Sequence, residues 1–111
     1  MNKLTGKKEF ADEVAGSMSL SLVHFKTEWN GASQLVTMII EDLAKTYRGR
    51  VNFFAVDMET DNLLAMEYGV SEIPAILFFS NGEVIDHAKG LIPKNMLIMK
   101  IENALSSIKN Y

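Results

Sequence analysis

Two short apolar segments on either side of one long amphipathic segment are the feature that most restricts the fold of this chain. Residues 20–25 and 51–56 are both short, largely apolar and rich in β-forming side chains. Such runs are typical of strands buried on both faces of a sheet. Because a helical crossover joins parallel strands with a right-handed connection, the sequence predicts a β-α-β unit.

The connecting helix is expected over residues 32–47. Asn30 or a neighbouring residue can cap its N-terminal end, and Gly49 can end it in a left-handed conformation. A broad apolar face with helical spacing is predicted to pack on the sheet. Its members are Leu35, Val36, Ile39, Ile40, Leu43, Ala44 and Tyr47.

The second half of the chain predicts an antiparallel hairpin. Asn81-Gly82 lies between two β-rich runs, residues 75–79 and 83–87. Asn-Gly in this position is the strongest short-range signal for a tight hairpin turn. The central sheet is therefore expected to be mixed, with a parallel half followed by an antiparallel pair.

Three further helices complete the predicted pattern. They are expected over residues 5–14 with Thr5 as a cap, over residues 62–68, and over residues 94–108 after Pro93. This order predicts one α/β domain that covers residues 1–111, with helices on both faces of the sheet.

Cysteine is absent from all 111 residues, and this absence removes several classes of chemistry. It excludes disulfides, thiolate nucleophiles, iron–sulfur clusters and zinc-thiolate sites within the chain. The two histidines, His24 and His87, are far apart in sequence and show no metal-ligand spacing. We therefore expect neither a metal nor another cofactor.

Charge and hydropathy limit the partners. The net charge is −3, and the Lys and Arg residues are scattered among acidic residues, so we expect no nucleic-acid partner. No apolar run approaches the roughly 18 to 20 residues needed to span a bilayer, and no apolar signal segment opens the sequence. We expect a cytoplasmic protein with no membrane partner.

Several local sequences carry a resemblance to a known family. Residues 22–25 are followed by Glu28-Trp29, residues 68–74 end in Ile73-Pro74, and residues 79–83 contain the hairpin turn. With Gly90 before the last helix, their joint spacing resembles thioredoxin from about residue 20 to residue 105. The resemblance implies a thioredoxin fold, a three-layer αβα arrangement with a mixed sheet of four to five strands. It also implies that a first edge strand is reduced to residues 2–4 or missing.

The resemblance places a redox motif where this chain cannot support redox chemistry. The family carries Trp-Cys-Gly-Pro-Cys, whereas this chain reads Trp29-Asn30-Gly31-Ala32-Ser33. Asn30 and Ser33 stand at the two cysteine positions. Neither an amide nor an unactivated hydroxyl replaces a thiolate, so we expect no dithiol oxidoreductase activity and assign no catalytic residue.

The family's supporting residues are replaced as well. Its buried proton-handling acid would lie at His24, its nearby lysine at Ala55, and a second tryptophan at Lys26. The resemblance therefore indicates a member that lacks both the dithiol and the groups that serve it.

What the resemblance retains is a docking surface. It implies a cis bond between Ile73 and Pro74, with the Ile73 backbone free to pair with an extended segment by strand addition. Six residues would form a shallow apolar surface, named here the docking surface: Trp29, Ala32, Ile73, Pro74, Gly90 and Leu91. The leading hypothesis is a non-catalytic domain that binds an extended peptide or a protein partner there.

Two other functions remain open at this point. The family resemblance itself suggests a thiol-disulfide oxidoreductase of cell redox homeostasis. Ser33, near a helix N-terminus, could instead bind glutathione or another thiol, or could merely satisfy backbone N–H groups of the first turn.

Other residues have two interpretations each. His24 is either paired with Ser33 as a nucleophile site or is a neutral, hydrogen-bonded core residue. Trp29 either docks a partner or packs against its own loop. Met96 and Met99 fall off the apolar stripe of the last helix and mark either a contact surface or ordinary exposed positions.

Overall fold

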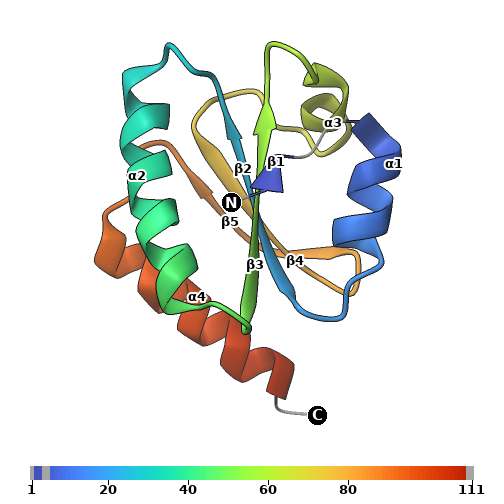
Figure 1. Ribbon diagram of the computed structural model, residues 1–111, viewed down its shortest axis with the longest axis vertical. Helices are drawn as coiled ribbons and strands as arrows, with labels where there is room; N and C mark the ends of the chain where they lie inside the picture. Colours follow the sequence, from blue (N-terminus) through green and yellow to red (C-terminus); the bar gives the residue numbers. More distant parts are fainter. Residues whose placement is uncertain (1, 4–5, 110–111) are drawn as a thin grey trace.

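The computed structural model describes residues 2–3 and 6–109. The elements follow in the order β1 (Asn2–Lys3), α1 (Gly6–Phe10), a π-helical segment η1 (Ala11–Ala15), β2 (Leu20–Lys26), α2 (Gly31–Thr46), β3 (Val51–Asp57), α3 (Asn62–Glu67), β4 (Ala75–Ser80), β5 (Glu83–Lys89) and α4 (Lys94–Lys109). Figure 1 shows these elements along the chain. Every predicted helix and strand has a counterpart, with bounds that differ by a few residues.

The five strands form one mixed sheet in the order β1-β3-β2-β4-β5. β2 and β3 run parallel in register from the Leu20–Val51 pair to the Lys26–Asp57 pair, and α2 connects them. β4 lies antiparallel to both β2 and β5. The predicted β-α-β unit and the predicted hairpin are therefore both confirmed, and the reduced first strand is the two-residue β1, parallel to β3.

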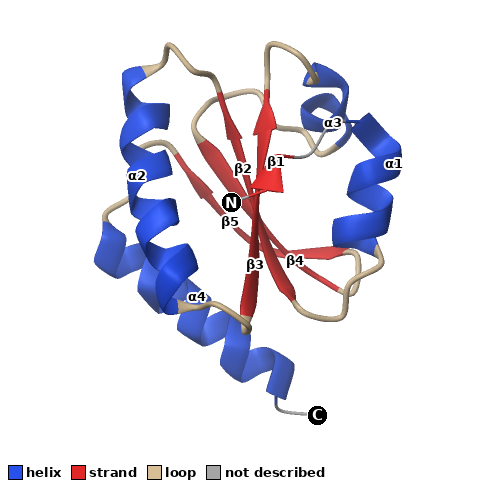
Figure 2. Cartoon of the chain, in the orientation of Figure 1, coloured by secondary structure: helices blue, strands red, loops and turns tan. Residues whose placement is uncertain are grey.

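Helices cover both faces of the sheet, which gives the predicted three layers. α2 and α4 lie on one face, and α1 and α3 lie on the other (Figure 2). Alternate residues of each strand point to opposite faces. On β2, for example, Leu20 and Leu22 pack with α2 and α4, whereas Val23 and Phe25 pack with Leu64 of α3.

The buried stripe of α2 is narrower than predicted. The helix buries Ser33, Val36, Ile40 and Leu43, which recur at spacings of three and four residues. The spacing predicts Leu35 on the buried face, but Leu35 flanks this stripe and is 50% exposed. The correction leaves a large apolar side chain at the surface of α2.

The ends of the outer helices agree with the sequence where they are described. The carbonyl oxygen of Pro93 accepts hydrogen bonds from the N–H groups of Met96 and Leu97, so Pro93 opens α4 as expected. The N-terminal helix continues from α1 into η1 and ends at Gly16. The predicted cap, Thr5, lies outside the described residues. None of the helices in the described part of the chain is long and apolar enough to cross a membrane.

The hairpin turn uses two left-handed residues, Asn81 with φ of 53° and Gly82 with φ of 78°. This conformation is that of the type I′ turn, for which Asn-Gly is preferred. A Cβ atom added to Gly82 would lie 2.9 Å from the carbonyl oxygen of Ala15. The hairpin turn is thus fitted closely against the C-terminal end of η1.

Replacing Gly82 with alanine is expected to lower the free energy of unfolding by at least about 2 kcal/mol, because the side chain adds a steric clash to the cost of a left-handed conformation. Gly49 is the matched control, since its φ is 84° but an added Cβ would meet nothing within 4 Å. Gly49→Ala should cost only about 1 kcal/mol. Urea unfolding of both variants measures the difference, and equal losses would contradict the clash.

Candidate functional site

Four loops meet at one end of the central sheet. β2 and β3 end there, as the Lys26–Asp57 pair shows, and β4 begins there, because Ala75 pairs with Phe25 of β2. β5 ends at the same place, where Lys89 pairs with Ala75. The topology therefore brings the loops that carry Trp29, Ile73-Pro74 and Gly90-Leu91 to a common edge (Figure 1).

The loops before β4 and after β5 are joined directly. The N–H of Gly90 donates a hydrogen bond to the carbonyl oxygen of Pro74 at 2.7 Å. The Ile73–Pro74 peptide bond is cis, and Gly90 takes a left-handed φ of 74°. Pro74 is buried and Ile73 is partly buried. These two loops form one fixed wall of the site.

The backbone of Ile73 is free for pairing. The ladder between β2 and β4 begins at Ala75, two residues later. Among the hydrogen bonds of the described residues, none joins the N–H or the carbonyl oxygen of Ile73 to another backbone group. Ile73, which lies in the bend just before β4, thus offers a backbone donor and a backbone acceptor to a segment that approaches from outside.

The start of α2 uses Asn30 and Ser33 for local structure. The side-chain oxygen of Asn30 caps the helix by accepting a hydrogen bond from the N–H of Ser33 at 2.8 Å. Ser33 is fully buried, and its hydroxyl oxygen accepts a hydrogen bond from the N–H of Thr27 at 3.5 Å. This hydroxyl faces the interior of the loop rather than the surface.

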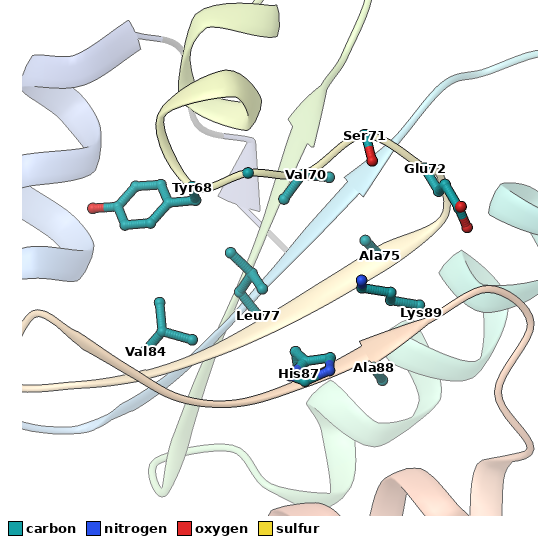
Figure 3. Close-up of a pocket in the computed structure, with 11 residues that line it drawn as sticks. Tyr68, Val70, Ser71, Glu72, Ala75, Leu77, Val84, His87, Ala88 and Lys89 are labelled. Atoms are coloured by element: carbon teal, nitrogen blue, oxygen red, sulfur yellow. The ribbon is translucent and has the colours of Figure 1, made fainter.

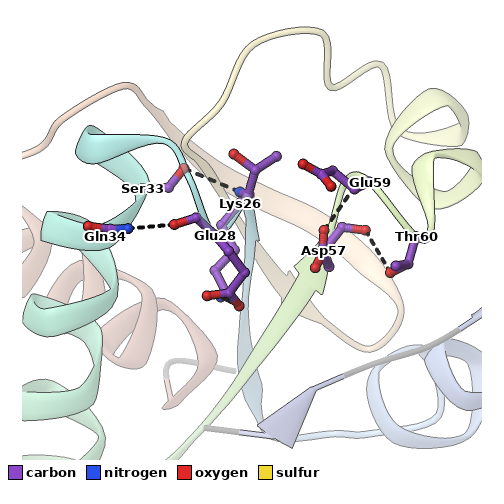
Figure 4. A network of polar contacts seen from close by, with 8 residues as sticks. Lys26, Glu28, Ser33, Gln34, Asp57, Glu59 and Thr60 are labelled. Atoms are coloured by element: carbon purple, nitrogen blue, oxygen red, sulfur yellow. Dashed lines mark hydrogen bonds and ion pairs between the residues drawn. The ribbon is translucent and has the colours of Figure 1, made fainter.

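Polar contacts hold the loop after β2 and the loop after β3 in place (Figure 4). Gln34 donates from its side chain to the carbonyl oxygen of Glu28, whose carboxylate forms an ion pair with Lys26 at 2.8 Å. After β3, the carboxylate of Asp57 accepts a hydrogen bond from the N–H of Glu59 at 2.9 Å. The loops that flank the site are therefore held in place independently of any sulfur chemistry.

Trp29 stands at the surface of this edge. Its side chain is 74% exposed, so the interpretation that it packs against its own loop is wrong. Leu91 is exposed as well, whereas Ala32 is partly buried in the first turn of α2. All six residues of the docking surface lie at the same end of the sheet, with two large apolar side chains pointing outward.

His24 lies beneath this surface in the central strand. It is fully buried between the register positions of Ala55 on β3 and Ile76 on β4. Burial, with a smaller contribution from the positive charge of Lys26, lowers its pKa from 6.5 to about 4. Full burial confirms the interpretation of His24 as a core residue, and the lowered pKa favours the neutral ring. The expected hydrogen bond is not found, since neither ring nitrogen has a partner among the described residues.

A groove that the sequence analysis missed lies beside the docking surface, and we name it the α2 groove. It has a volume of about 470 Å³ and is lined by six apolar residues: Leu35, Met38, Ile39, Leu91, Ile92 and Pro93. The sequence does not predict this groove for two reasons. The helical spacing favours a core position for Leu35, and the approach of residues 91–93 to α2 depends on the tertiary structure.

A second concavity lies on the other face of the sheet (Figure 3). It has a volume of about 240 Å³ and extends between the loop before β4 and the edge strand β5. Ala75 and Leu77 form its floor, while Glu72, His87 and Lys89 stand around it. A rim with carboxylate and ammonium groups together selects no single class of ligand. His87 is exposed, as predicted.

Other predicted features are placed as follows. Met96 and Met99 are exposed on α4 and lie outside its buried stripe, which includes Leu97 and Ile101. Within the described ranges, no three His, Asp or Glu side chains cluster closely enough to hold a metal ion. The residues that the structure brings together are those of the docking surface.

Comparisons with known proteins agree with this architecture. The family model described as Thioredoxin matches residues 2–103. A thioredoxin of Chlorobaculum thiosulfatiphilum is 33% identical over 95 residues, which are 86% of this chain and 88% of that protein. A chloroplastic M-type thioredoxin of Pisum sativum is 37% identical over 89 residues, or 80% of this chain, which spans only 52% of that relative. Among solved structures, a mutant thioredoxin from Halobacterium salinarum NRC-1 matches with a TM-score of 0.83 at 26% identity, and the match covers 92% of this chain and 88% of that one.

Proposed function

This chain belongs to the thioredoxin family, and on that premise we propose that it is a non-catalytic domain that binds an extended peptide or protein segment at the docking surface. The observation that carries the proposal is the unpaired backbone of Ile73 beside the exposed side chains of Trp29 and Leu91. The N–H and carbonyl groups of Ile73 would form backbone hydrogen bonds with the bound segment, and the side chains of Trp29 and Leu91 would pack against it.

Redox turnover is not part of the proposed function. Thiol–disulfide exchange needs a thiolate to attack a disulfide and a second thiol to release the product. The chain contains no cysteine, and Asn30 and Ser33 hold the helix start together instead. We therefore expect the isolated chain to give no measurable reduction of insulin disulfides.

Thiol binding through Ser33 is less well supported than peptide binding. A hydroxyl that binds the sulfur of glutathione has to reach the surface, and Ser33 is fully buried with its oxygen directed to the N–H of Thr27. Titration with millimolar glutathione, followed by the fluorescence of Trp29, should give no change.

Replacing Trp29 with alanine is expected to weaken peptide binding about tenfold or more, because a large exposed aromatic surface is lost at the centre of the interface. The probe is a panel of capped nine-residue peptides built from Thr, Ser and Val without Trp. Binding is measured by titration of backbone amide chemical shifts.

The control is Met18→Ala, which removes an exposed apolar side chain before β2, at the opposite end of the sheet. This variant should bind the panel as the unchanged protein does. If Trp29→Ala bound the peptides with unchanged affinity, the docking surface would be misplaced.

A further inference from the structure

The α2 groove shares residues with the docking surface and extends it along the helix. Leu91 belongs to both, and Gly90, the residue before it, is joined to Pro74 by the 2.7 Å hydrogen bond. On α2, Ala32 of the docking surface lies three residues before Leu35, and Leu35 lies three before Met38, so consecutive members of this row are neighbours on the helix surface. A segment paired with Ile73 would therefore reach the groove without leaving the protein surface.

The walls of the α2 groove are large apolar side chains that remain exposed. Leu35 is 50% exposed and Met38 is 65% exposed, although both lie on a helix that packs on the core. Ile92 is buried beneath them and Ile39 is partly buried. An apolar side chain placed between these walls would remove apolar surface on both sides from water.

Among the described residues, none of the six that line the α2 groove carries a charge. Lys94, the residue after Pro93, forms an ion pair with Asp42 of α2. The two side chains at this rim thus neutralise each other, and all six lining residues are apolar. A charged side chain would lose hydration in the groove without gaining a partner among the six lining residues, whereas an uncharged apolar side chain has no such cost.

We propose that the α2 groove is a specificity pocket that takes one large uncharged apolar side chain, such as Leu, Met or Phe, of the segment bound at the docking surface. The inference rests on the proposed function and deepens it, because it names the chemistry of the partner. Backbone pairing at Ile73 tolerates many sequences, and the α2 groove selects among them. A partner then needs an extended segment with an apolar anchor, and it needs no cysteine.

The test uses a scan of capped nine-residue peptides. The host peptide contains only Thr and Ser, and a single Leu is moved through its successive positions. In the unchanged protein, Leu at one position should raise affinity about tenfold over the host, as expected for burial of one apolar side chain. Lys or Glu at that position should give no gain. Amide chemical-shift titration measures all affinities.

The decisive variant is Leu35→Gln with Met38→Gln, which keeps good helix-forming residues and makes the walls polar. The advantage of the Leu peptide should fall below about twofold, while affinity for the host stays within twofold. The matched control is Leu63→Gln with Met66→Gln, an equally spaced pair on α3 that is 66% and 69% exposed. This control should keep the full advantage.

The outcomes separate the two proposals. In one outcome, the host and Leu peptides bind and Trp29→Ala weakens their binding, but the Leu peptide binds no more tightly than the host, or its advantage survives in Leu35→Gln/Met38→Gln. The specificity pocket is then wrong and the docking surface stands. If none of the peptides binds the unchanged protein, both proposals fail. The pocket is supported if the Leu peptide binds more tightly than the host and if Leu35→Gln/Met38→Gln, but not the control on α3, removes this difference.

Discussion

Acidification from pH 7 to pH 4 is expected to remove about 3 kcal/mol of the free energy of unfolding through His24 alone, because burial lowers its pKa from 6.5 to about 4. The unfolded chain binds a proton at this side chain below about pH 6.5, whereas the folded chain does so only near pH 4. The contribution is therefore fully present above pH 6.5 and is lost progressively as the pH falls toward 4.

His24→Leu isolates this effect. Leucine is apolar and of similar volume, and it removes two buried ring nitrogens that have no partner among the described residues. Urea unfolding at several pH values should show a flatter acid slope and a protein at least as stable at pH 7. The control is His87→Leu, which retains His24 and should retain its slope. If His24→Leu kept the slope of the unchanged protein, the acid sensitivity would come from other groups.

A double variant, Asn30→Cys with Ser33→Cys, is expected to gain catalytic reduction of insulin disulfides from a background of none. The side chain at position 30 already points to position 33, since Asn30 accepts a hydrogen bond from the N–H of Ser33 at 2.8 Å. Both positions stand at the N-terminus of α2, where the helix dipole favours a thiolate. The gain should be incomplete because His24 and Ala55 stand where the family resemblance implies an acid and a lysine.

The single variant Asn30→Cys is the matched control. It has a nucleophile but no second thiol within the chain, so its mixed disulfides should persist without turnover. The double variant also loses the cap of α2, at a cost of about 1 kcal/mol, so its fold is checked by circular dichroism. A folded double variant without any activity would mean that this edge no longer accepts an extended substrate.

The features that the sequence predicted correctly depend on local patterns. Short apolar runs predict buried strands at residues 20–25 and 51–56. The turn is predicted by Asn81-Gly82, because these two residues readily adopt the positive φ angles that the turn requires. The docking surface could be proposed because the family resemblance aligned Trp29 and Ile73 with known positions. Its assembly at one edge follows from the topology.

What the sequence did not predict depends on distances between segments that are remote in the chain. Leu35 has helical spacing with the core residues, and only the packing of α2 in the folded chain determines that it flanks the buried stripe. The α2 groove exists because residues 91–93 approach that helix. The missing partner of His24 could not be foreseen either, because its neighbours come from two other strands.

The most direct test of the central claim is a map of backbone amide shifts on binding of the Leu peptide. Pairing at the docking surface predicts the largest changes at the amides of Ile73 and Gly90 and at the indole N–H of Trp29, with no disulfide chemistry involved. Changes confined to the concavity around Leu77 and Lys89 on the other face of the sheet, with Trp29 and Ile73 unmoved, would contradict it.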